Sequence, residues 1–490
     1  MLLLMQGKKQ YQEKLFTSFQ LSDHVPEENF YRRLKEALPL QWLYKATRNY
    51  YGAEGQQSVD PVVFFKLILI GYLENLCSDR RIINMTRLRL DMLYFIGYDI
   101  DEPLPWHSTL SRTRQLYGEE LFKQLFRKVL AQCIEKGMVA GKRQAMDSVA
   151  VQANASMDSL LKKEILADGN DFAAALKNSE EEPSSATSGS DKSSASANNQ
   201  KSYSPTDKDA RISVKPGKTR RLNYLAQVSV DTANHVITQI QSDYADKKDS
   251  QCLPSLLHHT IGNLKEHGLL IQEVLADGNY SSSDALMALE QNNIEGYIPN
   301  FGHYKPDREG FRFDKENDRY ICSQGKYLPF KYIKDGHGKK NRMRQYRSAR
   351  KDCGKCPIKS TCIGKGFEKA IAVTVDKALY DRMHNRLQTP KAHRLKKLRS
   401  STVEPVLGTL VNFLGMRRVN TKGIQQANKC MLMAAIAYNL KKLLKWQTPK
   451  IETAIVVMKR AKKPFLPNSV GSSLVETSSV SKYFFLLTQR

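Results

Sequence analysis

The chain has 490 residues, enough for about three domains, and 41% of them are apolar, which is enough for a folded core. Lys and Arg total 76 against 50 Asp and Glu, so the formal net charge is +26. This excess favours a polyanionic partner, above all nucleic acid, over an anionic membrane. The best apolar run, PVVFFKLILIGYL, contains Lys66 and is too short to span a bilayer, so it predicts a buried helix. No secretion signal is recognisable, and we expect a cytoplasmic protein without a membrane partner.

Residues 1–135 show the apolar spacing of about 3.6 residues that is typical of helices. Several of these segments begin with Asp or Ser, end near Gly or Pro, and carry Arg and Lys on their outer faces. The stretch predicts an all-helical N-terminal domain. It is either a DNA-binding region with a helix-turn-helix type of contact, or a bundle that only supports the next domain.

From residue 140 the pattern changes to that of an α/β domain. The segment RQAMDSVAVQ alternates like a strand, and RLNYLAQVSVD with HVITQIQSDYAD predicts a hairpin. The chain then continues with a helix, a short strand at EVLA, a second helix, a strand at EGYIPN and late helices. This order predicts one central sheet flanked by helices, of the RNase H-like type. This RNase H-like domain then comprises residues 140–300 and 366–447, with a flexible Ser-rich insertion at 165–210 and a basic, Cys-containing insertion at 301–365.

Two aspartates and a glutamate stand out in this part of the chain. Asp147 lies inside the first strand, where a buried carboxylate is costly unless it is paired or bound to metal. Asp277 follows the strand EVLA at its carboxyl end, where ligand sites of α/β sheets lie. Glu404 is the only acid between Arg382 and Ile451. Three converging carboxylates could hold two Mg²⁺ (or Mn²⁺) ions, about 3.5–4 Å apart, for phosphoryl transfer.

Each of these acids also has a purely structural explanation. Asp147 could cap a turn, and Asp277 could start a turn with the glycine that follows it. Ser401 and Glu404 form the S-x-x-E pattern of a capping box with Pro405 in the first turn, which predicts that a helix opens here. The lack of other acids around Glu404 and its two upstream partners favour a catalytic role.

Four segments resemble those of bacterial insertion-sequence DDE transposases: PWHSTLSRTRQLYG, AMDSVAVQANAS, VLADGNY and RSSTVEPVLGTLVNFLGMRRVNTKGIQQANKCMLMAAIAYNLKKLL. The resemblance covers about residues 25–447 and is greatest to the insertion-sequence-1182-like group within the insertion-sequence-4-like assembly. It implies an RNase H-like catalytic domain with an insertion before the glutamate, divalent-metal catalysis, and recognition of terminal inverted repeats. On motif position, the family's acids correspond to Asp147, Asp277 and Glu404.

Two features depart from the family pattern. Related transposases often carry a Tyr and an Arg shortly before the Glu, and a Lys a turn or two after it. Here Arg399 precedes Glu404 without a nearby Tyr, and Val411 and Asn412 occupy the region of the Lys. Residues 451–490 match nothing expected of the family, so this tail is atypical.

Four of the eight cysteines lie in the insertion before Glu404, at Cys322, Cys353, Cys356 and Cys362. Four thiolates are enough for a tetrahedral structural Zn²⁺, which would stabilise a small loop-rich module. Their irregular spacing leaves reduced, unligated thiols and a redox role as alternatives. The other four are expected to be small core hydrophobes: Cys77, Cys133, Cys252 and Cys430.

A dense basic patch surrounds these cysteines, and in the sequence only Asp335 and Asp352 lie near it. We expect it to hold the DNA backbone through phosphate contacts, rather than to be only a solvated loop. It comprises Lys339, Lys340, Arg342, Arg344, Arg347, Arg350 and Lys351. Arg399, Arg417 and Arg418 are further candidates for DNA contact.

These features together predict a DNA transposase that cuts and joins the ends of an insertion sequence. Its partner is double-stranded DNA, both as terminal inverted repeats and as target. A homodimer or larger assembly is expected, because two ends must be held together. The protein would be associated with the nucleoid when bound to DNA. Two alternatives stay open: an RNase H-like nuclease or resolvase that cuts without joining, and an inactive sequence-specific DNA-binding protein.

Overall fold

The computed structural model describes residues 19–52, 58–162, 199, 201–213, 220–300, 304, 306–335 and 342–446. All of them belong to one compact unit, Met1–Trp446. Residues 165–198 and 200 of the expected Ser-rich insertion, Lys339, Lys340 and the tail 451–490 lie outside the described residues. In the described part, no helix is long and apolar enough to cross a membrane.

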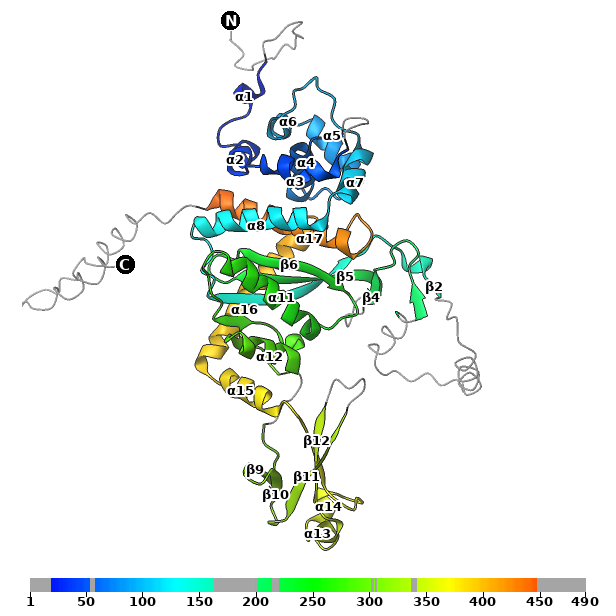
Figure 1. Cartoon of the computed structure of the whole chain (residues 1–490), viewed down its shortest axis with the longest axis vertical. Helices are drawn as coiled ribbons and strands as arrows, with labels where there is room; N and C mark the ends of the chain where they lie inside the picture. Colours follow the sequence, from blue (N-terminus) through cyan, green and yellow to red (C-terminus); the bar gives the residue numbers. More distant parts are fainter. Residues whose placement is uncertain are drawn as a thin grey trace, which may run out of the picture. The chain divides into compact units, whose positions relative to one another are not determined.

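The N-terminal part is all-helical, as predicted (Figure 1). Its apolar run forms α4, which is buried on nearly every side, and Asp60 caps that helix by accepting from the backbone N–H groups of Val62 and Val63. Cys77 is exposed, so its assignment to the core was wrong; it lies in the connection after α4 and not inside a helix. The helices are α1 (Leu21–His24), α2 (Phe30–Ala37), α3 (Trp42–Thr47), α4 (Pro61–Leu73), α5 (Asp79–Arg87), α6 (Leu90–Ile96), α7 (His107–Leu116) and α8 (Glu119–Glu135).

A mixed sheet follows, and its strands come in the predicted order along the chain. Strand β5 pairs antiparallel with both β1 and β6, whereas β7 and β8 continue the sheet parallel to β1. The spatial order is therefore β6-β5-β1-β7-β8, and the short β4 (Arg211–Ser213) pairs with the beginning of β5. The strands are β1 (Arg143–Gln152), β5 (Arg221–Asp231), β6 (Ile237–Tyr244), β7 (Glu273–Leu275) and β8 (Glu295–Tyr297).

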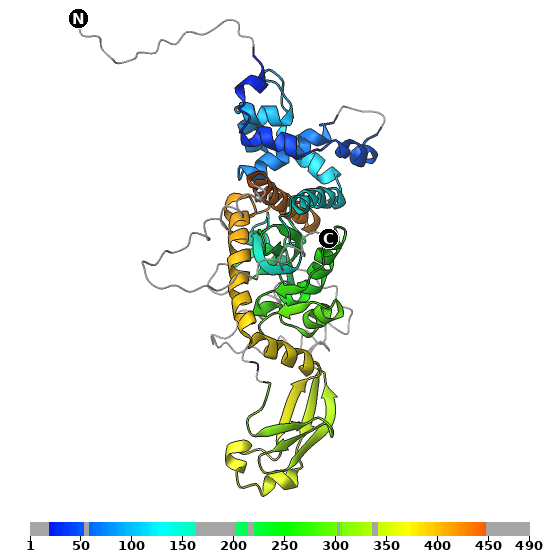
Figure 2. The same ribbon diagram turned by 90° about the vertical axis from the view of Figure 1, so that its left-hand side faces the viewer.

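Helices cover the sheet on both faces. The long α16 (Pro390–Phe413) packs against β1, β5, β7 and β8, while α11 (Asp249–Lys265) packs against β5 and β6 and α12 (Ser283–Gln291) against β8. Figure 2 shows α16 as a long orange-yellow helix along one side of the sheet and the green helices on the other side. The last helix, α17 (Ile424–Lys445), contacts β6 and also α8, α4 and α2, so it joins the sheet to the N-terminal helices.

The prediction that a helix opens at Glu404 is wrong, because Glu404 lies within the single helix α16. Thr389 caps this helix by accepting from the Ala392 N–H, and Pro390 is its first residue. Pro405 lies inside the helix, where it removes one backbone hydrogen bond. Buried side chains on both sides of Pro405 continue the apolar stripe against the sheet, and this packing holds the helix together: Ala392, Leu395, Thr402, Val403, Val406 and Leu410.

The basic insertion folds into a small antiparallel sheet of order β13-β12-β11-β10-β9. Its own apolar cluster consists of Tyr320, Leu328, Tyr346 and Ile371. The elements are β9 (Phe311–Asp314), β10 (Arg319–Cys322), β11 (Tyr327–Lys334), β12 (Met343–Arg347), α13 (Arg350–Gly354), α14 (Lys359–Cys362) and β13 (Ala370–Thr374). After it, α15 (Lys377–Leu387) leads into α16.

Candidate active site

Strand pairing brings Asp147 and Asp277 to the same level of the sheet. The parallel register sets Ala145 of β1 opposite Leu275 of β7. Asp147 and Asp277 each follow two residues later, so their side chains leave the same face as those of Ala145 and Leu275. Because β7 ends at Leu275, the edge of β1 beside Asp147 is no longer covered by a paired strand. Two carboxylates that are 130 residues apart in sequence (277 − 147) therefore become neighbours.

Asp277 is held by the turn that it begins. It caps the short 3-10 turn Gly278–Tyr280, accepting from the Asn279 N–H at 3.0 Å and from the Asn279 side-chain amide at 3.0 Å. A Cβ atom at Gly278 would lie only 3.3 Å from the carbonyl oxygen of Pro299, so a glycine suits this close approach. The structural explanation of Asp277 as a turn residue is thus correct, and it fixes the direction of the carboxylate.

Arg399 of α16 links the other two acids. Its guanidinium donates to Asp147 Oδ2 at 2.9 Å and lies 3.9 Å from Glu404 Oε1. The side chains of Arg399 and Asp147 are 16% and 19% exposed, whereas that of Glu404 is 63% exposed. Two of the predicted acids are therefore bridged by one cation, and Glu404 has room to change rotamer.

Burial raises the pKa of Asp147, and the negative charge of Asp277 raises it further. The Ser148 N–H, which donates to Asp147 at 2.8 Å, and the charge of Arg399 oppose this effect without cancelling it. The same two carboxylates also act on the buried Tyr280, whose pKa is raised mainly by its own burial. Asp147 and Asp277 thus lie close enough to repel each other, and a cation between them would relieve that repulsion.

A cavity of about 370 Å³ opens beside these charges. Asp277 and Arg399 line it together with His393 and Lys396 of α16. The rest of the lining is mostly apolar: Leu275, Ala276, Gly278, Tyr297, Pro299, Leu387, Ala392 and Leu395. His393 and Lys396 were not predicted from the sequence. If the predicted helix had begun at Pro390, the spacing of three residues between His393, Lys396 and Arg399 would have placed these side chains near one another on the helix surface.

The donor set fits a hard divalent cation. Carboxylate oxygens are the ligands that Mg²⁺ and Mn²⁺ prefer, and the Arg399 guanidinium already occupies the position of a cation between Asp147 and Glu404. In the present side-chain arrangement, the described residues contain no three His, Cys, Asp or Glu side chains that could hold one metal ion. A metal ion at these acids would thus replace the contacts that Arg399 makes.

The four insertion cysteines do not form a metal group within the described residues. Cys322 packs beside the apolar cluster of the small sheet, whereas Cys353 Sγ lies 3.0 Å from the Ser348 hydroxyl. All four thiols are free and partly exposed. In this arrangement the four thiols do not converge on one point, and the zinc site stays a prediction beside the alternatives of reduced thiols and a redox role.

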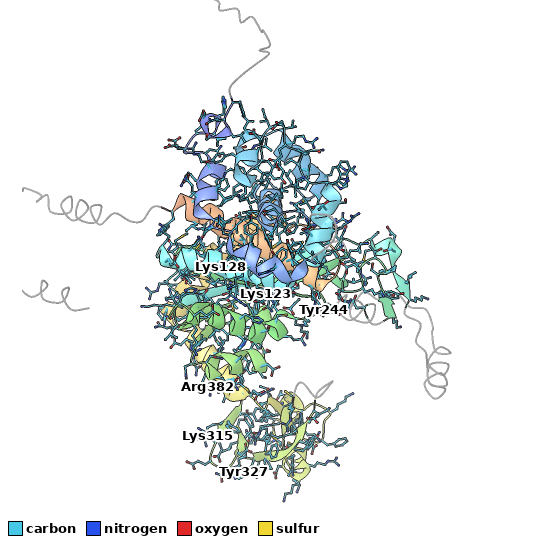
Figure 3. All side chains as sticks on the ribbon, turned by 45° about the horizontal axis from the view of Figure 1, so that its top comes forward. Lys123, Lys128, Tyr244, Lys315, Tyr327 and Arg382 are labelled. Atoms are coloured by element: carbon cyan, nitrogen blue, oxygen red, sulfur yellow. The ribbon has the colours of Figure 1, made fainter. Side chains whose placement is uncertain are left out.

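All four arginines of the basic patch lie near acidic side chains, and of these acids only Asp335 was noted in the sequence. Arg344 pairs with Asp318, Arg347 pairs with Glu368 at 2.8 Å, and Glu368 lies 3.9 Å from Arg350. Arg342 lies 3.6 Å from Asp335, and Lys351 is exposed. A neighbouring arginine, Arg319, stacks over the exposed ring of Tyr327, which Figure 3 labels, at 3.8 Å. Several of these charges therefore stabilise the small sheet, which lowers the positive charge available to DNA.

Arg417 and Arg418 lie at the end of β1, on the segment that pairs with it. The backbone of Gln152 donates to the Arg417 carbonyl at 3.1 Å, and Val419 donates to the Gln152 carbonyl at 2.9 Å. Both arginine side chains are exposed, and their bonds are to the neutral side chains of Asn412 and Asn154. Within the described residues, neither arginine is paired with an acid, so both can offer positive charge to a ligand at the strand that carries Asp147.

Comparison with known proteins gives matches in two stretches. Residues 19–116 match a family model described as a transposase domain (DUF772), and residues 321–444 match one described as a transposase DDE domain. No curated protein matches the chain. A solved "Mos1 transposase paired-end complex with left transposon end" is 11% identical and covers 56% of this chain and 73% of that chain. Its TM-score of 0.16 is too low to support any conclusion about the fold.

The second match defines the class of the protein, an enzyme that transfers phosphoryl groups on DNA. More particularly, the chain combines a transposase-type N-terminal region with a DDE transposase domain. Enzymes of this class depend on divalent metal ions. Of the three predicted acids, the matched range contains Glu404 but not Asp147 or Asp277.

Proposed function

We propose that this protein is a DNA transposase of the insertion-sequence-1182-like group. It would cut the terminal inverted repeats of an insertion sequence and join them to target DNA. The observation that carries the proposal is that Arg399 contacts Asp147 and approaches Glu404, while the strand register brings Asp277 beside Asp147 at the open edge of the sheet. The strand order β6-β5-β1-β7-β8 supports an RNase H-like catalytic domain.

Each acid has a distinct part in this proposal. Asp147 and Asp277 come from adjacent strands, so their positions are fixed and they form the rigid half of the site. Glu404, exposed on α16, completes the site by a change of its side chain. When bound, Mg²⁺ or Mn²⁺ ions activate the attacking oxygen and stabilise the leaving oxygen of the phosphodiester. We assign no zinc to the mechanism.

Positive charge along α16 and after it would hold the substrate. His393 and Lys396 line the cavity beside Asp277, and Arg417 and Arg418 lie at the end of β1. Together they flank the acids on two sides, which suits a DNA backbone that passes over the site. The substrate would be the double-stranded ends of the element in the bacterial cytoplasm, held by a dimer or larger assembly because two ends must be joined.

The test is a strand-transfer assay with labelled terminal repeats and Mg²⁺ or Mn²⁺. The proposal predicts 3′-end cutting followed by joining to target DNA, with at least a 10³-fold loss in Asp147→Ala, on the order of what one essential catalytic group contributes. Cutting without joining would identify a nuclease or resolvase instead. Binding that survives Asp147→Ala, in a wild-type protein that never cuts, would identify a DNA-binding protein.

A further inference from the structure

Helix α5 (Asp79–Arg87) carries arginines that the fold leaves without partners. Its buried face consists of Ile82, Ile83 and Thr86. Its exposed positions include Arg80, Arg81, Asn84 and Arg87. Within the described parts of the chain, none of these four side chains has a hydrogen bond or an ion pair.

Nearby arginines behave differently, because the fold pairs them. Arg89 pairs with Glu74 at 3.2 Å and with Asp91 at 2.6 Å. On α8, Arg127 pairs with Glu120 at 3.0 Å. Among the described residues, Arg48 and Arg112 are also exposed without an ion pair, but α5 carries three such arginines on one short helix, and an unpaired basic face is what a polyanion binds.

Two close contacts hold α5 rigidly. A Cβ atom at Gly71 of α4 would lie 2.5 Å from Ile82 Cδ1, so α5 packs directly against the α4 backbone. At the start of α5, the buried Arg114 of α7 donates to both carboxylate oxygens of Asp79, at 3.0 and 2.6 Å. A short helix fixed at its start and along its buried face can present its exposed side chains in one defined geometry.

We propose that α5 reads base sequence in the major groove of duplex DNA, through Arg80, Arg81, Asn84 and Arg87. The major groove is about 12 Å wide and admits one helix. An arginine fork matches the acceptor pair of guanine, and an asparagine amide matches the donor and acceptor of adenine. Leu88, which is 82% exposed at the end of the helix, suits the methyl group of thymine. This inference rests on the proposed function in one respect only: the DNA that α5 reads would be the ends of the element.

The exposed apolar side chains around α5 could also bind a protein partner. Met85, Leu88 and Leu90 are exposed next to the arginines and would also fit a protein surface. Three unpaired arginines on a nine-residue helix favour DNA, because a protein partner would have to supply an acid for each of them. A protein partner, including a second copy of this chain, is therefore an outcome that the test must detect.

The test is selection from a library of random 25-base-pair duplexes by the full chain, in EDTA so that no cutting occurs. Wild type is expected to enrich a defined motif. Arg81→Lys and Arg87→Lys keep the charge but lose the fork. We expect each to lower the preference at one or two positions about tenfold, while affinity for unselected duplex changes less than about threefold. The matched control is Arg48→Lys, an exposed arginine outside α5, which should leave the motif unchanged.

A motif that is unchanged in the α5 variants, or no enriched motif with wild type, would overturn the inference. Loss of an oligomer in Leu88→Ala with an unchanged motif would reassign the face to a protein partner. Thermal unfolding of each variant excludes misfolding as the cause of a lost motif. Asp147→Ala separates base reading by α5 from catalysis, because this variant should still select the motif but should no longer cut DNA. If the wild-type protein selects a motif but never cuts, the α5 inference stands and the proposed transposase function fails.

Discussion

At the residue scale, Arg399 places a positive charge where a metal ion would be held. Its guanidinium contacts Asp147 and approaches Glu404, so it neutralises the acids while no metal is bound. Close to a divalent ion, the same charge would repel it by an energy on the order of several kcal/mol. Arg399 therefore has to move when metal binds, and a DNA phosphate is a suitable new partner for it.

We predict that Arg399→Gln tightens Mn²⁺ binding in the absence of DNA by about tenfold, because the competing charge is gone. Electron paramagnetic resonance of free Mn²⁺ measures this affinity directly. Arg394→Gln on the exposed side of the same helix removes an equal charge and should change it little. Weaker binding in Arg399→Gln would show instead that the guanidinium only organises the carboxylates.

The raised pKa of Asp147 predicts a pH-dependent cost to stability. Between the ordinary and the raised pKa, the folded state binds more protons than the unfolded state, so stability falls as the pH rises through this window. Above the window and without metal, Asp147→Asn should therefore unfold roughly 1 to 3 °C higher than wild type. The difference should vanish below about pH 3, where the carboxyl is protonated in both the folded and the unfolded state, and thermal unfolding across pH measures it. A variant less stable than wild type at neutral pH would contradict this account.

At the element scale, the sheet could be predicted from the sequence, whereas α16 and the small sheet could not. The alternation around Asp147 and the position of Asp277 after EVLA are local signals, and both strands are where those signals put them. The start of α16 was misplaced because Ser401, Glu404 and Pro405 match a cap, and only packing against the sheet overrides that signal.

The acidic partners of the basic patch were missed for a different reason. Asp318 and Arg344 are 26 residues apart, and Glu368 and Arg347 are 21 residues apart. They meet only because the antiparallel strands pair in a particular register. Sequence spacing alone therefore made these arginines look free.

The small sheet has its own apolar cluster, so we predict that it does not need zinc. The purified protein should contain much less than one equivalent of zinc, measured by elemental analysis. A strong zinc chelator should leave its thermal unfolding unchanged within about 1 °C, because removing a structural zinc would cost far more stability. One tightly held zinc whose removal unfolds residues 306–374 would restore the zinc site that the sequence suggested.

At the scale of the whole molecule, α17 makes the N-terminal helices and the sheet one structure. It contacts α8, α4 and α2 on the helical side and β6 and β5 in the sheet, and the largest apolar core runs through all of them. The N-terminal region and the candidate active site therefore belong to one packed structure. DNA bound by the N-terminal helices would thus be held at a fixed position relative to the candidate active site.

We predict that Leu440→Ala, at a fully buried position of α17, destabilises both parts together by about 2–5 kcal/mol. Hydrogen exchange should show equal losses of protection in α4 and in β5. Lys445→Ala, at an exposed position of the same helix, is the control and should have little effect. Loss of protection in only one part would show that the two unfold independently.

The central claim is that Asp147, Asp277 and Glu404 bind one metal centre. Iron-directed cleavage tests it most directly: Fe²⁺ takes the place of Mg²⁺, and ascorbate with peroxide cuts the backbone next to the bound ion. With DNA present, we predict cuts near Asp147, near Asp277 and within α16 around Glu404, all suppressed by excess Mg²⁺ and absent in Asp147→Ala. Cuts confined to the cysteines at 322–362, or none near these acids, would contradict the account.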